Sequence, residues 1–388
     1  MSASGSVYPG RLLGLIFLAG LAWFFGYRDT TTPPHITTAE FAPLEPADAL
    51  RKLATATVAG GAPGVVLLLQ NQHARFVEAA GTADKTLGTP MPTDHPLRIA
   101  SISKLYTAAV IHSLIEEGRL QLESKITQLF PPGVLDGLHN GPEITVRDLL
   151  LHQSGIPDYS DARHYLFGDW ESEPLTLART LPVSNRGDPG GAAGERFDYS
   201  SMGYILLGEV AQQVSGEPLG VLIERYITQP LGLSQTSYNL KYPLADSIHG
   251  YGTLLRPWAD TWNLWAHSGP DAGVMAPAHE LAEFLGALFF KDGALEHIGN
   301  AMLAEESTHN SGNQKQALGP HLVTGGDGLT LIGHSGDVFG YQSVAYAVPE
   351  RGYVFVGHIN CDCDELSGAL LGNFVRLEVA VSGRDRSH

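Results

Sequence analysis

The chain has 388 residues, of which 43% are hydrophobic and 17% are charged, and this length allows one large domain or two smaller ones. A formal net charge of −17 without any cluster of Lys and Arg argues against a nucleic-acid partner, because phosphate binding needs cationic side chains gathered on one face. The chain also lacks the Cys/His spacings of zinc sites, so we expect no metal.

An apolar stretch lies near the N-terminus, at residues 12–27, after a short tail at residues 1–11. Its length falls between the core of a signal peptide and a full membrane span. We expect a membrane anchor or a signal segment here, and a soluble N-terminal helix is the remaining alternative. Residues 28–44, which include a run of Thr and Pro, are predicted to be a tether. Both leading interpretations place the rest of the chain outside the cytoplasm, in the periplasm or the extracellular space.

The first half of the chain continues with helix and strand patterns. A helical period over residues 46–58 ends at a pair of glycines. Two apolar runs at 64–70 and 75–80, separated by a turn-like Asn-Gln-His, predict a hairpin. A long helix is predicted over 101–117, with Gly118 placed to end it.

The middle of the chain is rich in helices and loops, and strand character returns towards the C-terminus. The predicted elements are helices at 145–151, 202–214 and 219–227, strands at 329–333, 342–348 and 353–359, and a closing helix at about 364–381. Strands near both ends predict an α+β fold, in which an antiparallel sheet flanked by helices is assembled from both chain ends. A helical subdomain at about 105–245 would be inserted into a single domain that spans 45–382.

Ser101 and Lys104 lie three residues apart at the start of a predicted helix, so their side chains share one face. An amine at this place can accept the hydroxyl proton if burial or a positive neighbour lowers its pKa. The hydroxyl also lies in the first helical turn, where free N–H groups stabilise negative charge. The pair alone is weak evidence, because an N-capping serine followed by a solvated lysine has the same spacing.

Two later motifs complete an ordered triple. A Tyr-Ser-Ser at 199–201 precedes a predicted helix, and a His-Ser-Gly at 334–336 lies in a predicted strand. This order resembles the active-site serine family of class C β-lactamases, D-Ala-D-Ala carboxypeptidases, other penicillin-binding proteins and related esterases. The resemblance extends over about residues 45–360, and further matching segments lie at 98–101, 149–157, 230–233 and 272–282.

The resemblance implies a β-lactamase/transpeptidase-like fold and hydrolysis of an ester or amide bond, peptide-like or β-lactam-like, through an acyl-enzyme on Ser101. Lys104 and Tyr199 would handle the proton, and His334 would donate a hydrogen bond near Tyr199 and the substrate. The implied oxyanion hole consists of the backbone N–H groups of Ser101 and Asp337. Implied substrate contacts are Ser201, Ser335 and Gly336. No cofactor is implied, since side chains and backbone donors suffice for acyl transfer.

Two departures from the family pattern bear on the substrate. Ser201 stands where relatives commonly have Asn, and a hydroxyl is shorter and has fewer donors than an amide. His334 in place of a lysine favours carboxypeptidase-like or esterase-like relatives over a dedicated β-lactamase. The substrate is therefore a small molecule or peptide, and the sequence does not choose among muropeptide, β-lactam, short-chain ester and D-amino-acid amide.

Two other functions remain as alternatives. Gly333-His334-Ser335-Gly336 looks like the nucleophile elbow of an α/β-hydrolase, but Asp337 stands where that elbow needs Gly and the alternating β/α units are missing. The other alternative is a catalytically inactive penicillin-binding-like protein that acts as a binding or scaffold module.

Three further predictions concern single residues. Cys361 and Cys363 are separated by one residue, and we expect free thiols because a bridge would close a small ring. His152 is expected to hold its loop by a hydrogen bond. The last prediction concerns a stripe of tryptophans, which would pack on the core or line the substrate cleft: Trp258, Trp262 and Trp265.

Overall fold

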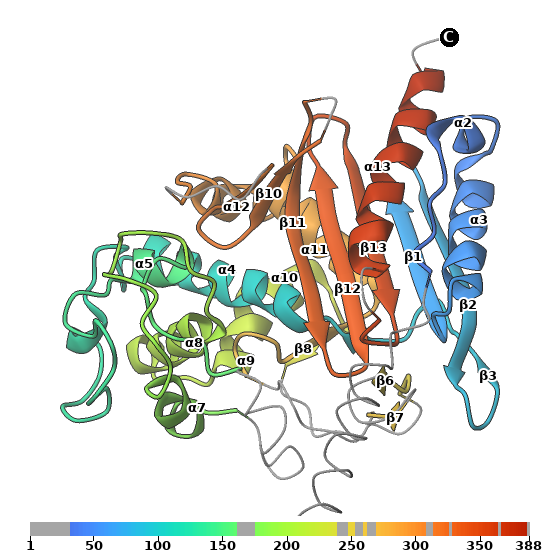
Figure 1. Cartoon of the computed structure of the whole chain (residues 1–388). Coiled ribbons are helices and arrows are strands. Elements are labelled where there is room, and N and C mark those ends of the chain that lie inside the picture. Colours follow the sequence, from blue (N-terminus) through green and yellow to red (C-terminus); the bar gives the residue numbers. More distant parts are fainter. Residues whose placement is uncertain are drawn as a thin grey trace, which may run out of the picture.

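The computed structural model shows an antiparallel sheet with helices on both faces and a helical region to one side (Figure 1). The predicted α+β class is confirmed. The described residues are 32–160, 175–238, 247–252, 259–261, 269–307, 313–325, 328–363 and 366–385.

The main sheet has eight strands in the order β3-β2-β1-β13-β12-β11-β10-β9, and every pairing is antiparallel. Val65 of β1 lies opposite Ile359 of β13, so the two ends of the chain meet at the centre of the sheet as predicted. The strands are β1 (Gly64–Gln70), β2 (Arg75–Asp84), β3 (Thr89–Pro90), β9 (Gln314–Gln316), β10 (His321–Thr324), β11 (Thr330–Val338), β12 (Tyr341–Val348) and β13 (Tyr353–Ile359).

Helices cover both faces of this sheet, which explains why β1 and β13 are mostly apolar rather than alternating. Val66 and Leu68 pack into the core on the α4 face, whereas Val65 and Leu67 pack into the core on the α3 face. The first face carries α4 (Ser103–Glu116), α11 (Ala278–Phe289) and α12 (Glu296–Met302); the second carries α2 (Thr38–Phe41), α3 (Pro46–Ala59) and α13 (Leu366–Asp385).

The helical region lies between β4 and β5 in the sequence, in agreement with the predicted insertion. Thr145 begins α5 with a capping box that it forms with Asp148. Gly118 adopts a φ of +72° after α4, which favours glycine at this helix end. The elements of this region are η2 (Ile126–Gln128), α5 (Val146–Leu150), α7 (Leu177–Ser184), α8 (Ser201–Ser215), α9 (Leu219–Ile223), the π-helix η3 (Glu224–Thr228) and α10 (Gln229–Leu231).

Five short strands lie outside the main sheet. They pair as β4-β8-β5 and β6-β7. The first set joins the segment just before Ser101 to the segment just after Asp271, which fixes these two residues relative to one another. The strands are β4 (Leu97–Arg98), β5 (Ser237–Tyr238), β6 (Tyr251–Gly252), β7 (Ala259–Asp260) and β8 (Val274–Ala276).

The predicted tether at 28–44 is wrong from residue 32 onwards. Ile36 and Phe41 are buried beside α13, and the Ile36 N–H donates to Asn373 Oδ1 over 2.9 Å. Apolar side chains within the Thr/Pro-rich stretch give it a surface to bury, which a tether lacks. Residues 12–27 lie outside the described residues, so their role stays a prediction. None of the helices in the described part of the chain is both long and apolar enough to span a membrane.

The prediction of free thiols at Cys361 and Cys363 is also wrong. The two cysteines form a disulfide, with Cα atoms 5.3 Å apart, and both side chains are fully buried. This separation lies within the usual range for bridged cysteines, so the single intervening residue does not prevent closure. The bridge lies at the end of β13, in the core shared with α13.

Candidate active site

Ser101 lies in η1 (Ala100–Ile102), a single 3-10 turn that connects β4 to α4. The predicted helix from residue 101 is therefore a 3-10 turn followed by an α-helix from Ser103. Ala100 has a φ of +51°, which is unfavourable for a residue with a side chain. Such backbone strain is found at functional sites, where the surrounding structure imposes it. Here it occurs next to the candidate nucleophile.

Lys104 faces Ser101 one turn further along, as the spacing predicted. Its side chain is fully buried, and Nζ donates to the hydroxyl oxygen of Ser101 over 3.0 Å. Nζ also donates to the Asp271 carbonyl oxygen over 3.2 Å and to Ser201 Oγ over 3.4 Å. An ammonium group has three donors, and all three are used by these contacts.

Tyr199 reaches the same hydroxyl from the loop before α8. Its phenol donates to Ser101 Oγ over 3.1 Å, and Lys104 Nζ lies 5.1 Å from the centre of the phenol ring. Ser101 Oγ therefore has an amine and a phenol within hydrogen-bond distance. The predicted convergence of these two motifs is confirmed as geometry.

The charge state of Lys104 follows from its surroundings. Burial lowers the pKa of Lys104, but negative charge on Tyr199 and Asp271 outweighs burial and raises that pKa above the usual value. Burial raises the pKa of Asp271, although the nearby Lys104 opposes this shift. Asp271 Oδ2 accepts a hydrogen bond from the Tyr159 phenol over 2.7 Å. The ammonium form of Lys104 is thus favoured, with Asp271 behind it.

The third motif lies on β11, beside the nucleophile turn. A Cβ atom on Gly336 would lie 2.2 Å from the Ile99 carbonyl oxygen and 3.0 Å from the Ser101 nitrogen. Any side chain at this position would therefore push the strand away from the turn. Glycine allows β11 to approach so closely that Ser335 and Asp337 line the same cavity as Ser101.

The hydrogen bond of His334 determines which ring nitrogen carries its proton. His334 Nδ1 lies 2.5 Å from the Ser335 carbonyl oxygen, which can only accept, so Nδ1 is the donor. Burial, His321 and Lys104 lower the pKa of His334 well below its usual value, which favours the neutral ring. Nε2 then carries a lone pair. In this neutral form the ring donor is bound to the backbone, so donation from His334 to the substrate would require the protonated ring and stays a prediction.

Two other histidines border Tyr199. His152 Nδ1 accepts the Ser200 N–H over 3.2 Å, and the imidazole stacks on Tyr199 with ring centres 4.3 Å apart. The predicted loop-holding role of His152 is confirmed. His321, on β10, stacks on His334 with ring centres 3.9 Å apart. No sequence motif marked His321, because only the pairing of β10 with β11 brings it to the site.

The predicted site residues surround one cavity of about 300 Å³. Its walls contain every predicted site residue except Lys104, which is buried behind Ser101. Ala272, from the matching segment 272–282, also lines it, together with residues that the sequence did not single out: Asp158, Ser160, Asp271, His321, Val338 and Ser367. The tryptophan stripe of residues 258, 262 and 265 lies outside the described residues.

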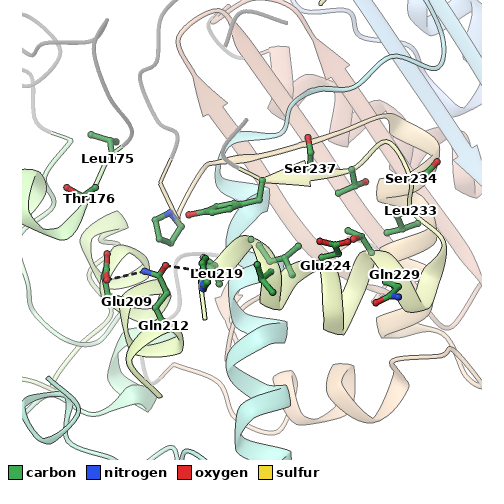
Figure 2. Close-up of a pocket in the computed structure, with 18 of the residues that line it drawn as sticks. Leu175, Thr176, Glu209, Gln212, Leu219, Glu224, Gln229, Leu233, Ser234 and Ser237 are labelled. Atoms are coloured by element: carbon green, nitrogen blue, oxygen red, sulfur yellow. Dashed lines mark hydrogen bonds between the residues drawn. The ribbon is translucent and has the colours of Figure 1, made fainter. Parts of the chain in front are cut away.

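A larger cavity of about 810 Å³ lies between α8, α9 and β5 (Figure 2). Its wall includes Glu209, whose carboxylate accepts from Gln212 over 3.1 Å, and Gln212 in turn accepts the Leu219 N–H over 3.3 Å. The described residues that line it include Glu209 and Glu224 but no Lys, His or Cys. None of the predicted site residues is among them, whereas all except Lys104 line the smaller cavity.

The comparisons agree with this geometry. A family model described as Beta-lactamase matches residues 50–374. The D-alanyl-D-alanine-carboxypeptidase/endopeptidase AmpH of Escherichia coli (strain K12) is 28% identical over 180 residues, which are 46% of each chain. Esterase EstB of Burkholderia gladioli is 27% identical over 45% of this chain and 46% of its own. These matches span about half the length of the curated relatives.

Among solved structures, a D-stereospecific amidohydrolase from Streptomyces sp. superimposes with a TM-score of 0.74 at 27% identity. This similarity covers 84% of the present chain and 98% of that chain. The match therefore extends over nearly the whole described fold, including the sheet and the helical region. The main sheet of the present chain is antiparallel, whereas the nucleophile elbow of an α/β-hydrolase lies in a sheet built from alternating β/α units. The alternative that Ser335 is the nucleophile of such an elbow is therefore wrong.

Proposed function

The chain belongs to the β-lactamase family, and we propose that it is a serine hydrolase that cleaves an ester or amide bond through an acyl-enzyme on Ser101. One observation carries this proposal: Ser101 Oγ lies 3.0 Å from Lys104 Nζ and 3.1 Å from the Tyr199 phenol oxygen. A hydroxyl between an amine and a phenol in a cavity is the arrangement of an activated nucleophile. Relatives named as a carboxypeptidase, an esterase and an amidohydrolase support hydrolysis.

In acylation, Ser101 Oγ attacks the substrate carbonyl carbon and loses its proton. An ammonium cannot accept a proton, so when Lys104 is charged the acceptor is the Tyr199 oxygen, after its own phenol proton has passed to solvent. Lys104 Nζ lies 5.1 Å from the centre of the Tyr199 ring and 3.0 Å from Ser101 Oγ, so its charge stabilises the negative charge that develops on these oxygens. The backbone N–H groups of Ser101 and Asp337 then stabilise the oxyanion of the tetrahedral intermediate.

In the second half of the reaction, the Tyr199 phenol returns its proton to the leaving group, and the carbon–leaving-group bond breaks. A water molecule next attacks the acyl-enzyme while Tyr199 takes a proton from it. The bond between the acyl carbon and Ser101 Oγ then breaks, Tyr199 passes the proton taken from water to Ser101 Oγ, and the acid leaves. Tyr199 suits both steps because its phenol is already hydrogen-bonded to Ser101 Oγ at 3.1 Å. The N-terminal segment at 12–27 would place this reaction outside the cytoplasm, at a membrane or after secretion.

Hydrolysis of p-nitrophenyl butyrate tests the proposal. We expect the purified fragment from residue 32 onwards to release p-nitrophenol well above the rate in buffer, because an activated ester demands only the nucleophile and the oxyanion hole. The assay follows absorbance at neutral pH. A protein that binds peptidoglycan fragments but leaves this ester, D-amino-acid p-nitroanilides and nitrocefin intact would instead be an inactive binding module.

A further inference from the structure

His334 lines the same cavity as Ser101 and Tyr199. Its ring centre is 6.4 Å from that of Tyr199, the residue that returns a proton to the leaving group in the proposed reaction. His321 stacks on the imidazole with ring centres 3.9 Å apart and is itself buried, with 7% of its surface exposed. These contacts hold the imidazole near Tyr199, the residue that protonates the departing group in the proposed reaction.

The polar edge that His334 offers is an acceptor. Its Nδ1 proton is held by the Ser335 carbonyl oxygen, whereas Nε2 is buried and has no hydrogen-bond partner among the described residues. A buried acceptor without a partner destabilises the site until a donor reaches it. An N–H or O–H of the leaving group can donate a hydrogen bond to this nitrogen. A carboxylate has acceptor oxygens only, so it cannot form this hydrogen bond.

The charges around the cavity also disfavour a carboxylate on the leaving group. All three donors of Lys104 are used, by Ser101, Ser201 and the Asp271 carbonyl oxygen, so none remains for a substrate carboxylate. Among the described residues that line the cavity, the charged types are aspartates at 158, 271 and 337, and none is Lys or Arg. Among these described lining residues, a carboxylate on the leaving group would meet aspartate side chains and no Lys or Arg to pair with.

We propose that the site selects substrates whose leaving group carries a hydrogen-bond donor and no carboxylate. His334 Nε2 is the atom that accepts this hydrogen bond. This inference rests on the proposed serine hydrolysis and narrows its substrate class. It favours amides and esters with an uncharged or amino-bearing leaving group over peptides that end in a free carboxylate and over β-lactams. His334 is thereby a residue that determines specificity.

A matched pair of esters tests this inference on the unmodified protein. Butyryl esters of 3-hydroxybenzamide and 3-hydroxybenzoic acid have the same acyl group and differ only by amide against carboxylate on the leaving phenol. We expect the amide ester to have a kcat/KM at least about tenfold higher, which is the effect of one buried hydrogen bond. Equal rates, or faster hydrolysis of the acid, would overturn the inference.

The net charge of −17 could also repel the acid from a distance. Repeating both assays in 1 M NaCl separates the causes, since the screening length falls to about 3 Å. A ratio that persists supports the contact with His334, and one that falls to unity refutes it. Absence of Ser101-dependent hydrolysis of both esters and of p-nitrophenyl butyrate would instead reject the proposed function.

Two variants at residue 334 then test the residue itself. His334→Gln has an amide that can turn its N–H towards the leaving group, and His334→Lys supplies a cationic donor. We expect both to lower the amide-to-acid ratio of kcat/KM by about tenfold or more, while p-nitrophenyl butyrate, which offers neither group, reports the remaining catalysis. If one of the two variants fails to fold, the other still tests the assignment. A wild-type ratio in a folded, active variant would contradict the assignment.

Discussion

Replacing Ser101 with alanine is expected to reduce hydrolysis of p-nitrophenyl butyrate to the rate in buffer, a fall in kcat of about 10⁶-fold when the nucleophile of a serine hydrolase is removed. The physical reason is that Lys104 and Tyr199 both direct their polar atoms at the Ser101 hydroxyl, at 3.0 and 3.1 Å. Ser201 Oγ also lies 3.4 Å from Lys104 Nζ, but of these two hydroxyls only that of Ser101 has a hydrogen bond from Tyr199. Initial rates measured by absorbance give the result.

Ser113→Ala is the matched control for this substitution. Ser113 lies on the same helix, α4, and its hydroxyl donates to the Ala109 carbonyl oxygen over 2.9 Å, outside the cavity. This variant should retain kcat within about threefold, because most effects of such a substitution are on stability. Substantial turnover by Ser101→Ala, with the variant folded, would show that another residue is the nucleophile.

Replacing Tyr199 with phenylalanine is expected to lower kcat by about 10²- to 10⁴-fold, the usual contribution of a general acid or base. Of the two side chains hydrogen-bonded to Ser101 Oγ, only the phenol can carry its proton to the leaving group if Lys104 remains an ammonium, as the raised pKa of Lys104 indicates. The ring itself stays, so stacking on His152 at 4.3 Å is retained. Single-turnover rates with p-nitrophenyl butyrate distinguish slow acylation from slow deacylation.

Tyr204→Phe provides the comparison for Tyr199→Phe. Tyr204 is fully buried on α8, and its hydroxyl donates to the Leu150 carbonyl oxygen over 3.2 Å. Loss of this bond should reduce stability by about 1 kcal/mol and leave kcat nearly unchanged. If Tyr199→Phe proved as active as Tyr204→Phe, Tyr199 would have no part in proton transfer.

Much of the fold could be predicted because local patterns and burial agree in this chain. The run at 353–359 is mostly apolar, with His358 as its polar exception, which predicts a strand covered on both faces, and β13 occupies the centre of the sheet. The spacing of Ser101 and Lys104 predicted a shared face, and their atoms lie 3.0 Å apart. Periodicity and motif spacing involve residues that are close together in the sequence, so both can be recognised without knowledge of the fold.

The remainder depends on contacts between distant segments. His321 reaches the site only because β10 pairs with β11, and its own sequence surroundings carry no motif. The proton of His334 is placed by the Ser335 carbonyl oxygen, a backbone orientation that residue types do not encode. The disulfide of Cys361 and Cys363 likewise depends on the chain path after β13. Tertiary geometry decided each of these features.

The most direct test of the convergence of Ser101, Lys104 and Tyr199 is the mass of the protein after exposure to a fluorophosphonate. We expect one covalent adduct per chain, located on the peptide that contains Ser101 and absent from Ser101→Ala. The hydroxyl oxygen becomes phosphonylated because only this serine has an amine and a phenol beside it within 3.1 Å among the described residues that line the cavity. An unlabelled protein, or an adduct on Ser335, would contradict the account.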